Sequence, residues 1–174
     1  MKKINLLLAA LMSGTILFTG CGADVGKGYS EPEDAAVACL EAEIEPDGEK
    51  LLSAVPQEAI DYVLDNYDIS ERELINKLED YIKYTDSLEL WTKDLSYEIV
   101  NVDYHSDTDV FKEAEDGLKR YNMNVSIENV CTVEFDVKGI EGGMSTSQDL
   151  MKISGNWYTV EMIYYPAMAV MQNV

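Results

Sequence analysis

The chain has 174 residues, of which 33 are acidic and 13 are basic, and its net charge at pH 7 is −20. This balance argues against nucleic-acid binding, because phosphate contacts need clustered lysine and arginine, and against adhesion to anionic lipid through surface charge. The length suits one domain, with a core that needs no disulfide or metal to hold it. The acidity itself favours solubility.

The N-terminus has the layout of a secretion signal. Lys2 and Lys3 come before an apolar stretch, residues 4–18, and two small residues separate that stretch from Cys21. A charged start, an apolar middle and a small-residue end are typical of a cleaved signal peptide. The stretch is too short for a membrane span, which needs about 20 apolar residues.

The sequence LFTGC, residues 17–21, resembles the lipobox of bacterial lipoproteins, in which the cysteine thiol receives diacylglycerol before cleavage. Phe18 occupies the position of the lipobox where leucine is usual. The alternative to a lipobox is an ordinary secretion signal in which Cys21 is incidental. We predict removal of residues 1–20, lipidation of Cys21, and a position on the extracytoplasmic face of the cell membrane. The lipid bilayer is the predicted partner, reached through acyl chains that contribute about 0.8 kcal/mol per buried methylene.

The predicted mature chain is more acidic than the whole, because it keeps all 33 acids but loses two of the 13 bases, giving 11 − 33 = −22. It divides into a lipidated tether, residues 21–29, one α+β domain, residues 30–165, and an apolar tail, residues 166–174. The tail is expected to pad the core or to lie along an exposed groove.

The first half of the domain has the signals of helices. Ser30 and Glu33 have the spacing of a capping box at the start of the first helix, which ends at residues 46–48. A short helix follows at residues 49–55 and another at residues 56–67. The apolar face of the first helix consists mostly of small side chains: Ala35, Ala36, Cys39, Leu40 and Ala42.

A longer helix is predicted after Ser70, which has the capping-box spacing to Glu73. The helical pattern continues to about Leu88 or Trp91. One face carries the apolar residues Leu74, Ile75, Leu78, Tyr81 and Ile82.

After Trp91 the apolar period changes from helical to alternating, which predicts a strand. The apolar residues change parity near Val100 and Asn101, and this change predicts a β-bulge. They are Leu95, Tyr97 and Ile99 before the change and Val100, Val102 and Tyr104 after it. Asp107 or Thr108 is predicted to cap the next helix. The buried stripe of that helix is Phe111, Ala114, Leu118 and Tyr121.

The last third of the domain predicts an antiparallel meander. Apolar and polar residues alternate over residues 125–137, which is typical of a strand with one buried face. Further strands are predicted at residues 146–153 and 157–165, and Pro166 is predicted to end the last one. The turns between strands lie at residues 142–143 and 154–156.

This order of elements resembles the NTF2-like (cystatin-like α+β) domains, specifically the small uncharacterised lipoproteins of Gram-positive bacteria with that fold. The stretches that carry the likeness are residues 29–36 (YSEPEDAA), 68–71 (DISE) and 153–158 (ISGNWY). The resemblance implies N-terminal helices packed on a curved antiparallel sheet of about four strands, one helix between the first and second strands, and a cone-shaped cavity. It implies no function, because this fold hosts enzymes, binders and structural modules.

The single histidine, His105, lies among acids that resemble a set of metal ligands: Asp103, Asp107, Asp109 and Glu113. The spacing fits no EF-hand loop, and zinc sites of the common kinds need further histidine or cysteine ligands. Acids at a junction between a strand and a helix also stabilise the helix N-terminus. We therefore expect no metal and no cofactor.

Two cysteines of the domain, Cys39 and Cys131, both point inward by periodicity. A disulfide between them is permitted outside the membrane. Buried free thiols are the alternative that an apolar core favours.

No sequence motif identifies a reaction, because the chain has neither a nucleophile elbow nor a phosphate-binding loop. The candidate ligand-binding residues, expected to line the cavity, are Trp91, Tyr97, His105 and Trp157. The sequence predicts a non-catalytic domain that binds a small ligand or a protein partner. Two alternatives stay open: an enzyme that uses a carboxylate with tyrosine or histidine in the cavity, and a structural module that dimerises through its sheet.

Overall fold

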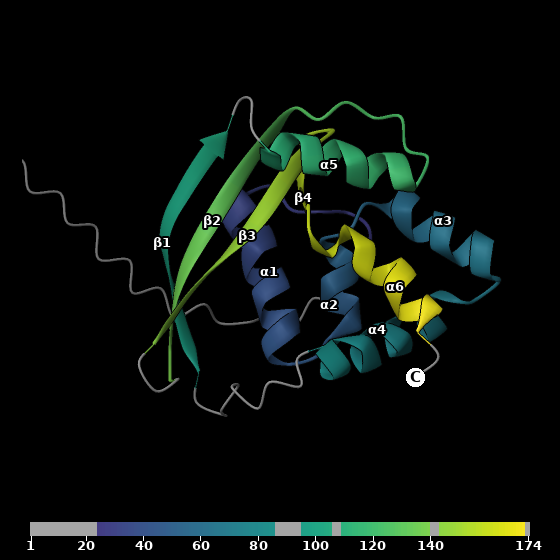
Figure 1. Cartoon of the computed structure of the whole chain (residues 1–174), viewed down its shortest axis with the longest axis horizontal. Coiled ribbons are helices and arrows are strands. Elements are labelled where there is room, and N and C mark those ends of the chain that lie inside the picture. Colours follow the sequence, from purple (N-terminus) through teal and green to yellow (C-terminus); the bar gives the residue numbers. More distant parts are fainter. Residues whose placement is uncertain (1–23, 86–94, 106–108, 140–142, 173–174) are drawn as a thin grey trace, which may run out of the picture.

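The computed structural model describes residues 24–85, 95–105, 109–139 and 143–172 (Figure 1). These residues form an α+β structure with six α-helices and one four-stranded antiparallel sheet, so the predicted fold class is confirmed at this level. The predicted signal peptide and Cys21 lie outside the described residues. Among the helices in these ranges, none is long and apolar enough to cross a membrane.

The helices are α1 (Pro32–Ile44), α2 (Gly48–Ser53), α3 (Gln57–Tyr67), α4 (Glu71–Thr85), α5 (Asp109–Arg120) and α6 (Tyr165–Met171). A short 3₁₀ turn, Met162–Tyr164, comes before α6. The strands are β1 (Ser96–His105), β2 (Asn129–Lys138), β3 (Met144–Ile153) and β4 (Asn156–Thr159), and they lie side by side in this order. Helix α5 follows β1 and precedes β2 in the chain.

Strand β1 contains the predicted bulge. Ile99 pairs with Phe135 and Asn101 pairs with Glu134, so Val100 is the extra residue on β1. The extra residue restores the alternation, because Ile99 before the bulge and Val102 after it pack against the same apolar cluster. A bulge of this kind also bends its strand.

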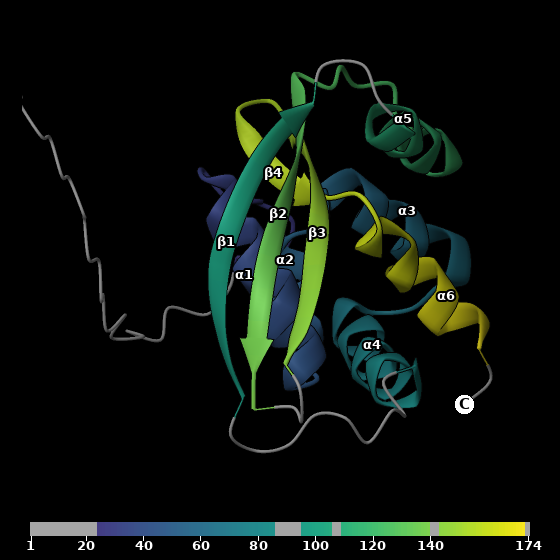
Figure 2. The same cartoon turned by 60° about the vertical axis from the view of Figure 1, so that its left-hand side comes forward.

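Helix α1 packs against one face of the sheet. Ala35, Ala36 and Leu40 are buried there against β2 residues such as Val133 and Phe135. Figure 2 shows α1 and α2 behind strands β1 to β3. The small side chains of α1 let its backbone come close to the strands, and complete burial of a side chain such as Phe135 contributes about 1.5–3 kcal/mol.

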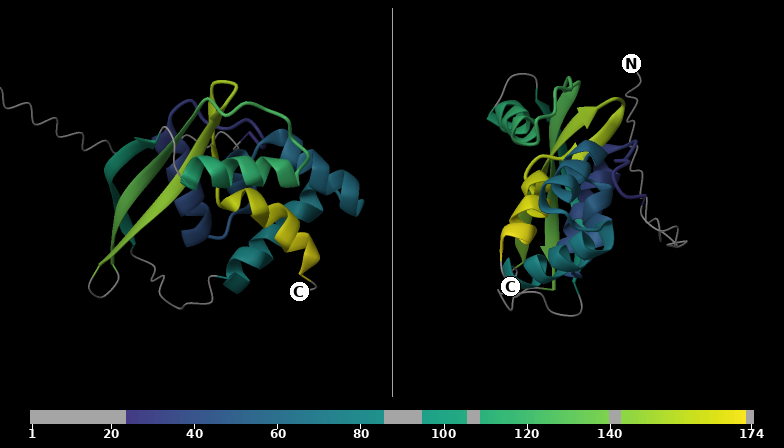
Figure 3. Two further views of the ribbon diagram at one scale, coloured as in Figure 1. Left: turned by 45° about the horizontal axis from the view of Figure 1, so that its top comes forward. Right: turned by 90° about the vertical axis from the view of Figure 1, so that its right-hand side faces the viewer.

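A second apolar cluster lies among the helices and the other face of the sheet. Val130 and Met151 point toward α5, where Ala114 and Leu118 are buried against them. Figure 3 shows α5 at one end of the strands. Neighbouring residues of β2 therefore pack in different apolar clusters, because successive side chains of a strand point to opposite faces.

The first predicted capping box does not form. Helix α1 begins at Pro32, and the preceding Glu31 makes no side-chain hydrogen bond to the helix. Proline is suited to the first helical position, because its φ is already helical and it has no N–H to satisfy. At the second predicted capping box, the Glu73 N–H donates a hydrogen bond to Ser70 Oγ at 3.3 Å.

The predicted end of the long helix at Leu88 or Trp91 lies outside the described residues. The predicted cap of α5 at residue 107 or 108 also lies outside them.

Two predicted strand boundaries are wrong by several residues, and β3 begins two residues before the predicted Thr146. Strand β2 begins at Asn129 rather than Val125, because its pairing with β1 ends at Val130 and its pairing with β3 ends at Asn129. Strand β4 ends at Thr159 rather than Tyr165. The Thr159 hydroxyl accepts a hydrogen bond from the Met162 N–H at 3.1 Å, which turns the chain into the 3₁₀ turn.

The apolar tail is helical and packs on the domain. Pro166 does not end a strand but lies in the first turn of α6, where its fixed φ suits a helix. Ala169 is buried, and α6 packs along α4. The Tyr81 and Tyr165 rings meet edge to face with centroids 5.2 Å apart. The tail therefore pads the core.

The end of the predicted tether is hydrogen-bonded to the domain. Gly26 N–H donates to the Leu52 carbonyl and Gly28 N–H to the Ser53 carbonyl, at 3.1 and 3.0 Å. Tyr29 then forms a two-way backbone pair with Trp157. Gly28 has a φ of +65°, and an added Cβ would lie 2.7 Å from the Tyr158 ring, so glycine is required there.

We predict that Gly48→Ala destabilises the protein, although alanine favours helices over glycine by up to about 1 kcal/mol. A Cβ at this position would lie 2.5 Å from the Ile75 carbonyl oxygen, and that backbone cannot rotate away. We expect the free energy of unfolding in urea to fall by about 1–3 kcal/mol. The exposed neighbour gives a control, since Glu49→Ala should change it by less than about 0.5 kcal/mol. Equal stability of Gly48→Ala and wild type would contradict the close contact of α2 with α4.

Candidate functional site

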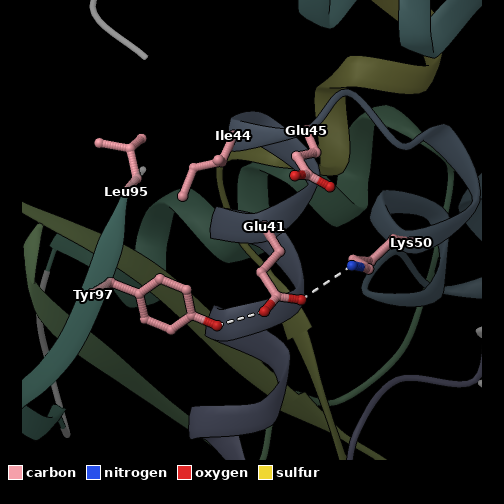
Figure 4. A pocket seen from close by; sticks show the side chains of 6 residues that line it. All are labelled: Glu41, Ile44, Glu45, Lys50, Leu95 and Tyr97. Carbon is pink, nitrogen blue, oxygen red and sulfur yellow. Dashed lines mark hydrogen bonds and ion pairs between the residues drawn. The ribbon is translucent and has the colours of Figure 1, made fainter. Parts of the chain in front are cut away.

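A pocket of about 330 Å³ lies where the end of α1, the start of α2 and the start of β1 meet. Figure 4 shows the side chains that line it, which come from segments far apart in the sequence. They are Glu41, Ile44, Glu45, Lys50, Leu95 and Tyr97.

The turn between α1 and α2 positions three of the polar groups. Glu41 lies in the last turn of α1, and Glu45 follows the helix directly, as its C-cap residue with an extended backbone. The Asp47 side chain accepts a hydrogen bond from the Lys50 N–H at 2.9 Å and caps α2. This cap fixes Lys50 in the first turn of α2, from which its ammonium reaches back to α1.

Two donors hold the Glu41 carboxylate (Figure 4). Tyr97 Oη donates to Glu41 Oε1 at 2.5 Å, and Lys50 Nζ donates to Oε2 at 3.0 Å. The Glu41 side chain is 18% exposed and that of Lys50 is 32% exposed, so the pair is only partly screened by water. A carboxylate this buried needs such partners, because an unpaired buried charge is strongly unfavourable.

Tyr97 is held in a defined orientation. Its ring meets the Phe135 ring edge to face, with centroids 6.0 Å apart. Burial raises the pKa of the Tyr97 phenol well above its usual value of 10.0, and the hydrogen bond to the Glu41 carboxylate raises it further. The phenol is therefore neutral at physiological pH and keeps its proton directed at Glu41.

The four predicted binding residues do not form one site. Tyr97 lines the pocket, whereas Trp91 lies outside the described residues. Tyr97 and His105 lie on opposite faces of the sheet, because their cross-strand partners Val137 and Val130 belong to different apolar clusters.

His105 takes part in a hydrogen-bonded chain across three strands. Its Nε2 lies 2.8 Å from Thr132 Oγ1, and the Thr132 hydroxyl donates to Asp149 Oδ1 at 2.5 Å. Since the hydroxyl proton is used on Asp149, Nε2 carries the proton of the neutral ring. The other ring nitrogen lies 4.0 Å from the Asp103 carboxylate. In the described part of the chain, no three histidine, cysteine or acidic side chains are grouped to hold a metal ion.

Trp157 is a core residue. Its side chain is buried between α1 and the sheet. The Tyr104 ring lies edge on with its centroid 6.0 Å away, and Lys152 Nζ lies 5.6 Å from the indole. It lines neither the pocket beside Tyr97 nor a second hollow at the bulge of β1.

The cysteines Cys39 and Cys131 are free and buried. They belong to different apolar clusters, on α1 and on β2. Burial raises the pKa of each thiol to about 12, so neither is a reactive thiolate at neutral pH.

A second hollow, of about 320 Å³, lies at the bulge on the sheet face opposite α1. Its lining residues are Val100, Glu134, Ser145, Thr146 and Ser147, and most of them are exposed. It holds no buried polar group that would orient a ligand.

Sequence reasoning missed Glu41 and Lys50. Glu41 lies on an acid-rich helix, and a charge there is typical of a solvated face. The available signal was the short turn at residues 46–48, which folds α2 back onto α1 and brings Lys50 within reach of the preceding helical turn.

Comparisons of the chain with protein-family models, with curated proteins and with solved structures gave no match.

We predict that Glu41 and Tyr97 are energetically coupled. Tyr97→Phe should lower the free energy of unfolding by about 1–2 kcal/mol, since a hydrogen bond to a charged group contributes about 1.5–3 kcal/mol and the loss of the hydroxyl is partly offset by hydration. Glu41→Gln should lower it by about 1–3 kcal/mol, because Lys50 loses its partner. A double-mutant cycle measured by urea unfolding should give a coupling above about 0.5 kcal/mol.

The same cycle has a pH signature. Because the folded pKa of Tyr97 is raised, its stabilising contribution is complete below the unfolded pKa of 10.0 and falls as the pH rises above that value. The difference in stability between wild type and Tyr97→Phe should therefore shrink above pH 10. If the stability difference between wild type and Tyr97→Phe grows above pH 10, the pKa of Tyr97 is not raised in the folded protein.

Proposed function

We propose that the protein is a lipid-anchored extracytoplasmic lipoprotein whose domain binds a small ligand without catalysing a reaction. The observation that carries the binding proposal is the partly buried Glu41 carboxylate, held by Tyr97 and Lys50 in the wall of an open pocket. Pockets that bind small molecules combine apolar walls with a few fixed polar groups. Ile44 and Leu95 supply the apolar wall here.

The anchor proposal rests on the LFTGC sequence and on the short chain that follows it. Gly26 is hydrogen-bonded to the domain, so five residue steps separate it from Cys21. These steps span at most about 17 Å. A lipidated Cys21 would hold the domain beside the membrane, against the repulsion between an acidic chain and anionic lipid.

An NTF2-like arrangement is the finer fold that we infer. The order of helices, bulged strand, helix and three further strands supports it. The bulge at Val100 also supports it, because bulges curve a sheet around the helix that it covers. The sheet contacts α1 through β2, β3 and β4.

An enzyme is the second candidate, and the close pairing of Glu41 with Tyr97 is the observation in its favour. A general base needs a carboxylate oxygen free to receive the substrate proton. Both Glu41 oxygens already accept hydrogen bonds, and the Tyr97 proton is directed at Glu41 rather than into the pocket. This arrangement favours binding over catalysis.

Dimerisation through the sheet has less support. Strand β1 lies at the edge of the sheet and would provide the pairing surface. It carries Glu98 and Asp103 with exposed side chains and a bulge at Val100, and such features oppose pairing between sheet edges.

We predict that Cys21→Ser releases the protein from the membrane fraction, because the serine hydroxyl does not receive diacylglycerol. Immunoblots of membrane and medium fractions measure the release, and intact-mass analysis of wild type should show the diacylglyceryl adduct. Cys39→Ser serves as the control, since this buried thiol should not affect anchoring. An unmodified wild-type chain that is freely secreted would end the lipoprotein proposal.

We predict that a small molecule co-purifies with the full chain and is lost when the pocket is filled. Leu95→Trp should fill the pocket, and native mass spectrometry should show a bound mass in wild type that this variant lacks. Val100→Trp is the matched control, because Val100 lies on the same stretch of chain but lines the other hollow. Retention of the bound mass by Leu95→Trp and its loss from Val100→Trp would place the ligand elsewhere.

A further inference from the structure

The pocket between α1, α2 and β1 has more negative than positive charge. Two carboxylates, of Glu41 and Glu45, and one ammonium, of Lys50, line it. Asp47 and Glu49 lie within three residues of Lys50 in the sequence, and the predicted mature chain carries −22. A negatively charged cleft of this kind attracts cations and repels anions before contact is made.

The single cation in the lining is already engaged. Lys50 Nζ donates to Glu41, and the Asp47 cap fixes its backbone. An anionic ligand would have to draw Lys50 away from Glu41 and leave a carboxylate that is 18% exposed without its cation. Removing one partner of a partly buried charge pair is unfavourable, because the remaining charge is incompletely hydrated.

Glu45, in contrast, has an unused acceptor at the mouth of the pocket. Figure 4 shows its carboxylate on the side of the pocket nearer Lys50, whereas the Ile44 side chain points the other way, toward Leu95. Among the residues that the structure describes, no hydrogen bond or ion pair engages this carboxylate. A carboxylate accepts hydrogen bonds but cannot donate them, so its natural partner is an N–H donor.

The apolar part of the lining selects the rest of the ligand. Ile44 and Leu95 face each other across the pocket from α1 and from the start of β1 (Figure 4). An alkyl or aromatic group between them would bury apolar surface, which is favourable.

We propose that this pocket binds an organic cation, a primary amine with an apolar body, through Glu45 and the Ile44–Leu95 wall; the inference rests on the proposed ligand-binding function and names its ligand class. The ammonium donates to the Glu45 carboxylate on the side of the pocket nearer Lys50, because the opposite side of Glu41 is occupied by the Tyr97 hydroxyl. The apolar body lies between Ile44 and Leu95. Tyr97 keeps Glu41 in place and does not itself bind the cation.

The test uses three probes of equal chain length, hexylammonium, hexanoate and hexanol, added to the purified full chain at physiological salt. Methyl NMR spectra follow the Ile44 and Leu95 signals, and titration gives the Kd. Hexylammonium should shift both signals, and hexanoate should shift neither. Preferential binding of hexanoate or hexanol would overturn the choice of a cation.

Three variants assign the contacts. Glu45→Gln should weaken hexylammonium binding by about two- to fivefold, as expected for a partly exposed ion pair. Lys50→Met should strengthen it by a similar factor, because the ligand then replaces the lost cation beside Glu41. Glu134→Gln, which removes one exposed charge on the opposite face of the sheet, should change the Kd by less than about 1.5-fold, since distant charges are screened.

The outcomes separate this inference from the proposed function. If Lys50→Met lowers the melting temperature too far for titration, Glu45→Gln alone decides, and an unchanged Kd in that variant contradicts the inference. If hexylammonium fails to bind while a co-purifying molecule is still lost from Leu95→Trp, the ligand is not a cation of this class but the pocket is still a binding site. If no molecule binds by either test, both proposals are wrong.

Discussion

The close approach of α1 to the sheet determines where the other elements lie. The residues of α1 that face β2, β3 and β4 are mostly small, so the helix axis comes near the strands and the sheet bends around it. The bulge at Val100 lets β1 take part in this curvature while its apolar residues stay on the inner face. With α1 fixed, the turn at residues 46–48 places α2 beside its end, and the pocket is the space left between that end and the start of β1.

This geometry explains how an acidic protein keeps the Glu41 carboxylate in a partly buried position. Most acids of the chain are solvated, and their repulsion is screened by water and salt. Glu41 is only partly exposed to water, and its charge is compensated by one cation and one hydroxyl. Each partner is in turn fixed by another contact: Lys50 by the Asp47 cap and Tyr97 by the Phe135 ring. The polar wall of the pocket is thus rigid before any ligand arrives, which lowers the entropic cost of binding.

Local patterns in the sequence predicted the elements that depend on local chemistry. The change of parity at Val100 marked the bulge, and the spacing of Ser70 to Glu73 marked the start of α4. The last strand was predicted too long, because residues 160–165 are rich in strand-forming side chains and a single hydrogen bond to Thr159 outweighs that preference. Glu41 and Lys50 were missed for a different reason. Their meeting depends on how two helices fold back on each other, and neither residue type signals burial on its own.

The hydrogen bonds at residues 26–29 determine how a pulling force on the N-terminus would pass into the domain. Gly26 and Gly28 bond to the end of α2, and Tyr29 pairs with β4 next to the core residue Trp157. A pull on the N-terminus, such as the drag on a domain held at a membrane, would act first on these backbone bonds and would be divided between a helix and a strand. Helix α1, which follows directly, would be shielded from that force until the Tyr29–Trp157 pair breaks. Glu41 on α1 would therefore stay in place under tension at the attachment point, whereas Lys50 lies on α2, which would carry part of the load.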